Sequence, residues 1–318
     1  MNMRLPELLV ATLLGVAMTL PGMAVAQTTD AVAVPGPVVD AEWVLDHEKA
    51  TTLINVSRRP SNYDATGFID DAPFVGLSEF MTERPGMKGT IQYLAPSPER
   101  FETVMQGLGV DDDDAIVIAP AGDRVYGDAT VATRFYWQLK YLGHDNVAIL
   151  DGGVAAWDAA GGAVADSPGS SANGRYTAGA ARDALFSATE DVQAVIDGGR
   201  SAQLVDNRPL VQFTGQMSKD YVDGNGHLPG ARPVPFTLFV EVRDGVVYWR
   251  SPKSAQSIVS AMLPDVDGPI INYCNSGHVS SLAWFGMSEI ADLPNVSLYD
   301  GSLHEWTLDG DRSLVIGE

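Results

Sequence analysis

The distribution of apolar residues divides the chain into two similar halves. Short runs rich in β-branched residues alternate with longer segments of helical periodicity, a pattern typical of parallel sheets flanked by helices. The predicted strands are 115–119, 147–150, 202–206, 269–273 and 295–299. The predicted helices are 128–142, 252–263 with Ser251 as its cap, and 280–291. We therefore expect an α/β fold in which each half builds a central parallel sheet.

An apolar segment at the N-terminus predicts export. Residues 8–20 are nearly all apolar, and residues 24–26 read Ala-Val-Ala, a small-x-small cleavage site. The alternative is an uncleaved membrane anchor. However, Pro6 and Pro21 bracket a run of only 14 residues, and a spanning helix needs about 20. We expect residues 1–26 to be removed, which gives a periplasmic or secreted protein with no membrane segment in its mature form.

An internal repeat supports two domains. Residues 149–157 and 298–306 share an Asp, a Gly and a Trp at the same spacing, 149 positions apart. Upstream, residues 53–58 and 204–208 match at nearly the same offset. Between the halves, a Gly- and Ser-rich stretch contains little that could pack. The predicted boundaries are a first domain over 38–162, a linker over 163–180 and a second domain over 181–318.

Charge and composition limit the classes of ligand and partner that this protein can bind. The chain has 20 Lys+Arg against 41 Asp+Glu, a formal charge of −21, which disfavours nucleic acid and anionic lipid surfaces. The single Cys excludes an intrachain disulfide and any multi-Cys metal site. The five His residues lack the spacing of a metal site. We expect no metal, no organic cofactor and a monomer.

The lone thiol, Cys274, sits at the carboxyl end of a predicted strand and before a predicted helix, where open α/β sheets place their ligands. The following loop of small residues can direct backbone N–H groups at the sulfur, and Gly277 supplies the freedom for a tight turn. Such a field favours the thiolate, the reactive form. The alternative is a buried structural Cys, which an oxidising compartment disfavours.

Five segments together resemble a known family. They are residues 204–208 (Leu-Val-Asp-Asn-Arg), 226–231 (Gly-His-Leu-Pro-Gly-Ala), 273–277 (Tyr-Cys-Asn-Ser-Gly), 284–290 and 300–306. Each is weak alone, but their order and spacing resemble a tandem rhodanese-domain sulfurtransferase from about Val38 to the C-terminus. The resemblance implies two rhodanese-like domains, of which the second is catalytic.

The resemblance also implies a double displacement. The Cys274 thiolate takes the outer sulfur of a small-molecule donor such as thiosulfate, and a thiophilic acceptor, cyanide or a thiol, then removes it from the persulfide. No metal or cofactor is needed. The implied substrate-binding residues are Asn275, Ser276, Gly277, His278, Val279 and Arg208.

The first domain lacks a Cys in its equivalent loop, residues 120–127. The resemblance implies that this domain is a scaffold covering one side of the cleft. Within its loop, Arg124 or Tyr126 is the residue that we expect to approach the cleft.

Three positions depart from the family pattern. Val279 stands where active members often have Arg or Thr, Ser276 where some have Lys, and Gln212 where many have Arg. Positive charge for an anionic donor must then come from Arg208, His278, the backbone or Arg232. These departures favour thiosulfate over 3-mercaptopyruvate, because the carboxylate of the latter usually needs a well-placed Arg.

Two of these cations have alternative roles. Arg208 could instead hold the strand end through a carboxylate, and His278 could point to solvent.

Two other function classes remain. A Cys-based phosphatase needs a phosphate-clamping Arg at the end of its loop, and no Arg lies between Cys274 and Arg312. The second is a non-enzymatic sulfur carrier or regulatory module, in which Cys274 holds sulfur without turnover. Sulfite release from thiosulfate in the presence of cyanide separates the carrier from the enzyme.

Overall fold

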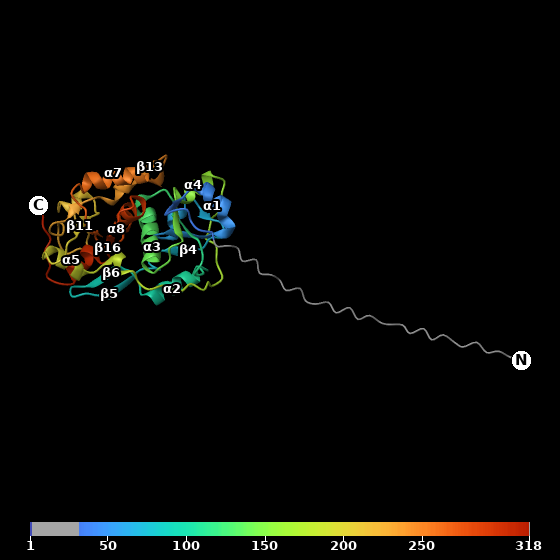
Figure 1. The fold of residues 1–318 in the computed structure, drawn as a ribbon, viewed down its shortest axis with the longest axis horizontal. Helices are drawn as coiled ribbons and strands as arrows, with labels where there is room; N and C mark the ends of the chain where they lie inside the picture. Colours follow the sequence, from blue (N-terminus) through green and yellow to red (C-terminus); the bar gives the residue numbers. More distant parts are fainter. Residues whose placement is uncertain (2–31, 318) are drawn as a thin grey trace. The chain divides into compact units, whose positions relative to one another are not determined.

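The computed structural model describes Met1 and residues 32–317 (Figure 1). Apart from Met1, the predicted signal peptide, residues 1–26, lies outside the described residues. Residues 32 to 317 form one compact unit. Within it are two five-stranded parallel sheets, one in each half of the sequence.

The two sheets have the same strand order. The first runs β1-β8-β7-β2-β4 and the second β10-β16-β15-β11-β12, and every pair in both is parallel. The first contains β1 (Val38–Val39), β2 (Thr52–Ser57), β4 (Phe74–Gly76), β7 (Ile116–Ala119) and β8 (Val147–Leu150). The second contains β10 (Phe186–Ser187), β11 (Gln203–Asp206), β12 (Arg232–Pro233), β15 (Ile270–Tyr273) and β16 (Val296–Tyr299). The predicted α/β fold with a parallel sheet in each half is confirmed.

The central strands are buried along their whole length, which is why they read as continuous apolar runs rather than alternating ones. The helices that flank them are α1 (Ala41–His47), α2 (Pro98–Gly107), α3 (Thr130–Tyr141), α4 (Gly153–Ala159), α5 (Thr189–Ile196), α6 (Leu210–Phe213), α7 (Pro252–Met262), α8 (Ser280–Trp284) and α9 (Ser302–Leu308). As predicted, Ser251 caps α7, because its hydroxyl accepts from the Ser254 N–H.

Two predicted helices are less regular than their sequences indicate. The segment 280–291 is not one α-helix: α8 ends at Trp284 and continues as a π-helical segment, Phe285–Ile290. The segment 128–142 forms α3 only from Thr130, after a kinked stretch at Val125–Ala129. The kink is possible because Gly127 has a φ of 102°, the left-handed region that favours glycine.

The two halves share a core. Helix α3 lies in the middle of the molecule (Figure 1) and packs against α8 of the other half. The Tyr136 ring meets Phe285 edge-on at 4.8 Å, and its hydroxyl donates to Glu289 over 2.7 Å. One continuous hydrophobic cluster contains residues from both sheets. The second half therefore does not pack independently of the first.

Each half also extends a hairpin onto the other. The hairpin of β5 (Thr82–Pro85) and β6 (Thr90–Leu94) reaches α9, where the Lys88 N–H donates to the Leu308 carbonyl over 2.9 Å. The hairpin of β13 (Val240–Arg243) and β14 (Val246–Trp249) reaches the first half, where the Val247 N–H donates to the Gly122 carbonyl over 2.8 Å.

The repeated Asp residues receive these hairpins. A carboxylate oxygen of Asp300 accepts from the Ala95 N–H, just after β6, over 2.9 Å. A carboxylate oxygen of Asp151 accepts from the Trp249 N–H, in β14, also over 2.9 Å. The repeated motif thus docks the opposite half in both directions. Its Trp residues, Trp157 and Trp306, are buried core residues.

The interpretation of residues 163–180 as a segment with little to pack is wrong. Residues Val164–Ala165 form a strand, β9, that pairs with β3 (Phe68–Ile69) of the first half. Further along, Tyr176 is buried and Arg175 forms an ion pair with Asp111. The glycines permit this close packing: a Cβ at Gly174 would lie 2.0 Å from the Val110 carbonyl oxygen.

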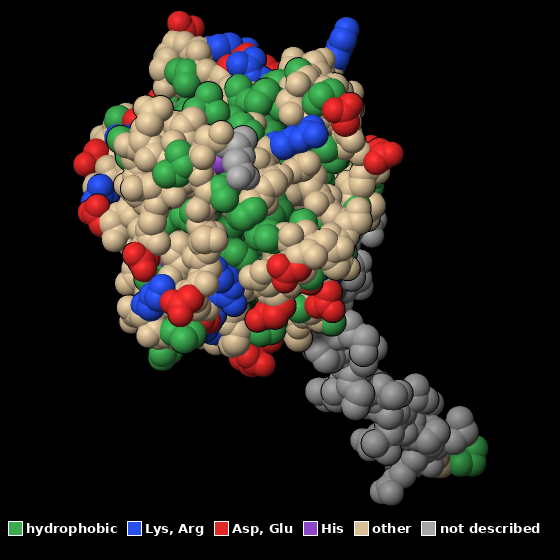
Figure 2. Space-filling model, turned by 90° about the vertical axis from the view of Figure 1, so that its left-hand side faces the viewer, with side chains coloured by type: hydrophobic (Ala, Val, Ile, Leu, Met, Phe, Trp, Pro, Cys, Tyr) green, Lys and Arg blue, Asp and Glu red, His purple; other side chains and the backbone are tan. Residues whose placement is uncertain are grey.

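On the face in Figure 2, acidic and basic side chains lie mainly toward the rim, and uncharged ones cover the middle. None of the described helices is both long and apolar enough to cross a bilayer.

Candidate active site

Cys274 lies directly after β15 and is buried, with 1% of its surface exposed. Its N–H donates to the Ser302 hydroxyl over 3.1 Å, and its carbonyl accepts from the Leu303 N–H over 3.2 Å. The start of α9 therefore fixes the backbone on both sides of the thiol-bearing carbon.

The loop after Cys274 turns at Gly277, whose φ is 71°. A Cβ there would lie 2.3 Å from the Asp300 carbonyl oxygen, so only glycine fits. The Gly277 N–H donates to the Ser302 hydroxyl over 2.9 Å. The expectation that successive loop N–H groups turn toward the sulfur therefore needs correction, since those of Cys274 and Gly277 are engaged by Ser302.

Other loop amides remain open. Among the described residues no acceptor is found for the N–H groups of Asn275, Ser276, His278, Val279 and Ser280. Unengaged N–H groups in a tight loop form a site for an anion. These amides, rather than that of Cys274 itself, are the ones available to a charged sulfur.

The sulfur has one hydroxyl partner. The Ser280 hydroxyl donates to the Cys274 sulfur over 3.4 Å. Ser280 is the first residue of α8 and is fully buried. Sequence reasoning stopped at Val279 and missed this contact. The hydroxyl one position beyond Val279 supplies a donor that the Val cannot.

The thiol lines a cavity of about 200 Å³, here called the Cys274 cavity. The reactive loop contributes Cys274, Asn275, Ser276, His278 and Val279. The other walls are Tyr126, Pro209, Gln212, Lys219, Tyr221 and Phe236. Tyr126 comes from the first half and approaches the cleft as predicted, whereas Arg124 does not line this cavity.

His278 is not a cation at neutral pH. The residue is 5% exposed, and its ring centroid lies 5.8 Å from that of Tyr126. Burial, with the charges of Arg58 and Arg134 adding to it, lowers the pKa of His278 to about 3. The suggestion that His278 carries positive charge is therefore wrong, and so is the alternative that it points to solvent. Its Nε2 atom is buried without a protein partner among the described residues.

Arg208 holds the end of a strand through a carboxylate, which is the alternative to substrate binding that the sequence left open. Its guanidinium donates to both oxygens of Asp206, over 2.6 to 3.0 Å, and to the Gly226 carbonyl over 2.7 Å. It is 1% exposed and does not line the Cys274 cavity, so the structure places it behind the site. A remaining contact, 3.4 Å to the Asn275 side-chain oxygen, links it to the reactive loop. Arg232, another suggested cation, is also absent from the lining.

Asn275 and Gln212 form one unit. The Asn275 side-chain NH₂ donates to the Gln212 side-chain oxygen over 2.8 Å, and the Asn275 carbonyl accepts from the His304 N–H over 2.7 Å. Gln212 thus braces the loop from α6 rather than offering positive charge.

The cationic side chain of the cavity is Lys219, which sequence reasoning missed. It is exposed and has no ion pair among the described residues. It stands beside Tyr221, whose pKa burial raises. Both residues lie in a polar loop with no periodicity, so no sequence signal placed them near Cys274.

The first half supports the reactive loop through Arg134 of α3. This side chain is fully buried, forms an ion pair with Asp300, and donates to the Gly277 carbonyl over 3.4 Å. It also lies over the Trp137 ring at 4.7 Å. An Arg inside a helix of the non-reactive half carried no sequence signal of this role.

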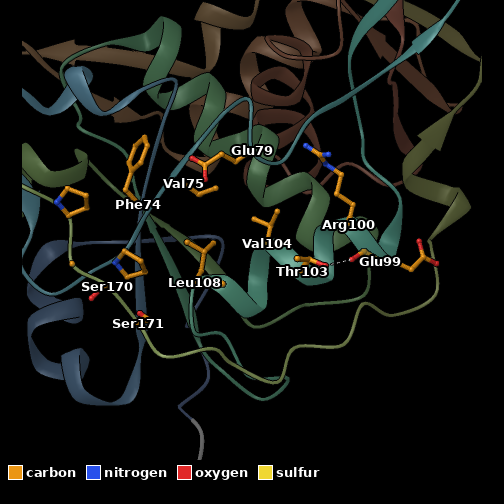
Figure 3. Close-up of a pocket in the computed structure, with 14 residues that line it drawn as sticks. Phe74, Val75, Glu79, Glu99, Arg100, Thr103, Val104, Leu108, Ser170 and Ser171 are labelled. Atoms are coloured by element: carbon orange, nitrogen blue, oxygen red, sulfur yellow. Dashed lines mark hydrogen bonds between the residues drawn. The ribbon is translucent and has the colours of Figure 1, made fainter.

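A larger hollow of about 1,100 Å³ lies elsewhere, between α2 and the linker segment (Figure 3). Apolar residues such as Phe74 and Leu108 line it together with Glu99 and Arg100. It shares no residue with the Cys274 cavity and contains no nucleophilic thiol. Chemistry rather than volume therefore identifies the site. No group of three or more potential metal ligands occurs within residues 32–317.

Comparison with known proteins agrees with this geometry. A family model described as a rhodanese-like domain matches residues 188–309. The chain is 28% identical to a 3-mercaptopyruvate sulfurtransferase of Escherichia coli K12 over 86% of this chain and 95% of that protein. It is also 28% identical to a putative thiosulfate sulfurtransferase of Haloferax volcanii, covering 85% and 92%.

A solved structure extends the likeness to both halves. The crystal structure of SseA, a 3-mercaptopyruvate sulfurtransferase from Escherichia coli, matches with a TM-score of 0.69 and 26% identity, over 84% of this chain and 98% of that one. Residues 188–309 therefore form a rhodanese-like domain. The whole chain, with two sheets of the same strand order and its thiol in the second half, is similar to rhodanese-like sulfurtransferases.

Proposed function

We propose that this enzyme moves a sulfane sulfur from thiosulfate to a thiophilic acceptor through a persulfide on Cys274. The observation that carries the proposal is the surrounding of the Cys274 sulfur. It accepts a hydrogen bond from the Ser280 hydroxyl at 3.4 Å, it lines a cavity of about 200 Å³, and the loop that follows it carries amides with no acceptor among the described residues.

In the first half-reaction the Cys274 thiolate attacks the outer sulfur of thiosulfate. A sulfur–sulfur bond forms to Cys274 while the bond within thiosulfate breaks, and sulfite leaves with the electron pair. Lys219 stands at the cavity to attract the dianion. The Ser280 hydroxyl and the open amides of the loop stabilise negative charge on sulfur before and after transfer.

In the second half-reaction a nucleophilic acceptor attacks the outer sulfur of the persulfide. The bond between the two sulfurs breaks, and Cys274 is released as a thiolate ready for another cycle. Because the cavity is small and is lined by Tyr126, Phe236 and Pro209, the part of the acceptor that attacks the sulfur must be narrow.

The lining favours thiosulfate over 3-mercaptopyruvate. A carboxylate substrate is best recognised by the two parallel N–H groups of an Arg, and no Arg lines the Cys274 cavity. A single Lys provides a point charge, which suits a small dianion without demanding a fixed orientation. Gln212, which stands where many relatives carry Arg, is occupied with Asn275.

We also propose export to the periplasm or beyond the cell, with cleavage after Ala26. The support is the apolar run of residues 8–20 and the small residues before Gln27. N-terminal sequencing of the protein recovered from the extracytoplasmic fraction tests this. A mature N-terminus at Gln27 supports it, whereas an intact Met1 in the cytoplasmic fraction contradicts it.

The function is tested by measuring sulfite and thiocyanate formed from thiosulfate and cyanide, with 3-mercaptopyruvate as the alternative donor. We expect stoichiometric release of both products and a higher kcat/KM for thiosulfate. A higher kcat/KM with 3-mercaptopyruvate would overturn the donor assignment. Persulfide formation without turnover would indicate a sulfur carrier instead of an enzyme.

A further inference from the structure

A second hollow, here called the arginine hollow, adjoins the Cys274 cavity on the side of the first half. It has a volume of about 570 Å³ and is lined by Arg58, Arg59 and Arg124 together with Asn62 and Tyr126. Its position is equivalent to the reactive site of the second half. Arg58 and Arg59 follow the carboxyl end of β2, and Arg124 and Tyr126 follow that of β7.

The hollow is a local excess of positive charge on a strongly acidic protein. Arg58 and Arg59 form no ion pair or side-chain hydrogen bond within residues 32–317. Arg124 is paired with Asp123 at 3.3 Å. The buried Asp128, which accepts from Asn62, has its pKa raised to about 6 by burial, with Asp123 adding to it. Three guanidinium groups therefore line this hollow, and Asp123 is the carboxylate that pairs with one of them, while the whole chain carries a charge of −21.

One residue connects the two spaces. Tyr126 lines both the arginine hollow and the Cys274 cavity, is half exposed, and packs against His278 of the reactive loop. The charge of Arg58 also acts on His278. A ligand with one end at the Cys274 sulfur can thus extend past Tyr126 onto the arginines.

Resting on the sulfur transfer proposed above, we infer that the arginine hollow binds the carboxylate groups of a small thiol acceptor whose sulfur enters the Cys274 cavity. The Cys274 cavity, at about 200 Å³, admits a thiol end but not a whole peptide-sized thiol, and the hollow offers more than twice that volume beside it. Guanidinium groups match carboxylates by bidentate hydrogen bonds. Elsewhere the negative protein repels an anionic thiol.

The reaction step is balanced without a further reactant. The acceptor thiol gives its proton to water, and its thiolate attacks the outer sulfur of the Cys274 persulfide. A new sulfur–sulfur bond forms on the acceptor, and the bond to Cys274 breaks. The electron pair stays on the Cys274 sulfur, which returns to the thiolate. Carboxylates held by the arginines take no part in bond making and only position the acceptor.

The test compares glutathione, which has two carboxylates, with its diethyl ester, which has none, as acceptors for thiosulfate sulfur. For the wild-type enzyme we expect a KM for glutathione about tenfold lower than for the ester, and this advantage should shrink at high salt. In Arg59→Gln and Arg124→Gln the KM for glutathione should rise about fivefold each, while the KM for the ester changes less than twofold. Arg100→Gln, in the separate hollow of Figure 3, is the matched control.

A binding measurement without turnover complements this. Calorimetric titration of the Cys274→Ser protein with S-methylglutathione should show binding that Arg59→Gln weakens. Equal KM values for glutathione and its ester in the wild type would overturn the inference. So would arginine variants that weaken sulfate binding but leave S-methylglutathione binding unchanged.

The proposed function is judged separately, by cyanide turnover of the wild type. If thiocyanate forms but glutathione shows no advantage over its ester, only the acceptor inference fails.

Discussion

The loop after β7 in the first half and the loop after β15 in the second stand at the same place in sheets of the same strand order, yet their chemistry differs. The first buries a carboxyl, Asp128, held by Ser57 and Asn62. The second presents a thiol, Cys274, with a hydroxyl donor and open amides. Duplicated sheets thus fix where a ligand can bind, whereas the loop residues decide what happens there.

The docking contacts show a second difference. Asp151 and Asp300 each accept an N–H from the hairpin of the other half. Only Asp300 is also paired with a buried Arg, Arg134. For Asp151, burial raises the pKa of the carboxyl. The Arg134 guanidinium, which belongs to the first half, thus pairs with Asp300 next to the Cys274 loop and helps to hold that loop in place.

Replacing the Cys274 thiol removes the main chemical difference between the loops after β7 and β15, and we expect it to have the largest effect. Cys274→Ser should abolish sulfur transfer while the fold persists, because oxygen fits the same space and cannot form a persulfide. Intact-mass measurement after thiosulfate treatment should show a gain of about 32 Da on the wild type only, as covalent catalysis requires. Turnover retained by the Ser variant would show that another nucleophile carries the reaction.

Removing Arg134 tests whether the first half supports the site. Arg134→Gln leaves the Asp300 carboxylate buried without its cation and should lower the free energy of unfolding by about 3 kcal/mol. Turnover should also fall, because the Gly277 carbonyl loses its partner. Urea unfolding and kcat/KM are the measurements.

Two variants control this experiment. The double variant Arg134→Gln/Asp300→Asn should be more stable than Arg134→Gln alone, because no unpaired charge remains buried. Arg182→Gln, which removes a partly exposed pair with Asp145, should cost at most about 1 kcal/mol. If Arg134→Gln and Arg182→Gln cost the same, Arg134 has no special role.

The hydrogen bond from the Ser280 hydroxyl to the Cys274 sulfur is tested by the rate of persulfide formation. Ser280→Ala should slow persulfide formation about tenfold, because a hydrogen bond to a charged group is lost. Stopped-flow measurement of sulfite release gives this rate. Ser280→Thr, which keeps the hydroxyl, should recover most of the rate, and Ser288→Ala on the same helical segment should not change it. An unaffected Ser280→Ala enzyme would leave the amides as the sole stabilising donors.

The loop of the first half is expected to affect stability rather than activity. Burial raises the pKa of Asp128 to about 6 in the folded protein, above the unfolded value near 4. The folded state therefore holds a proton that the unfolded state releases, and stability falls as pH rises from about 4 to about 6.

Asp128→Asn should remove this fall. The free energy of unfolding of the variant, minus that of the wild type, should increase by about 2 kcal/mol between pH 4 and pH 7. Denaturant unfolding across this range measures it. A difference independent of pH would mean that Asp128 titrates normally.

Local patterns predicted the parts of the molecule that depend on nearby residues. Strand Ile270–Tyr273 and the place of Cys274 after it follow from one apolar run and one loop. Arg134 and Lys219 could not be placed this way, because their proximity to the site depends on how distant segments pack. The charge state of His278 could not be predicted from the sequence either, because it depends on burial of the ring among residues of both halves.

Because each half binds a hairpin of the other half, the two halves depend on each other to complete their folding. While the chain is being made, the Asp151 carboxylate lacks its Trp249 partner until roughly a hundred further residues have followed. The first half alone is therefore an incomplete folding unit, and it gains full stability only when β13 and β14 arrive. The Cys274 loop is likewise held by a side chain of the other half, Arg134, so the loop gains its full set of contacts only after the two halves have packed together.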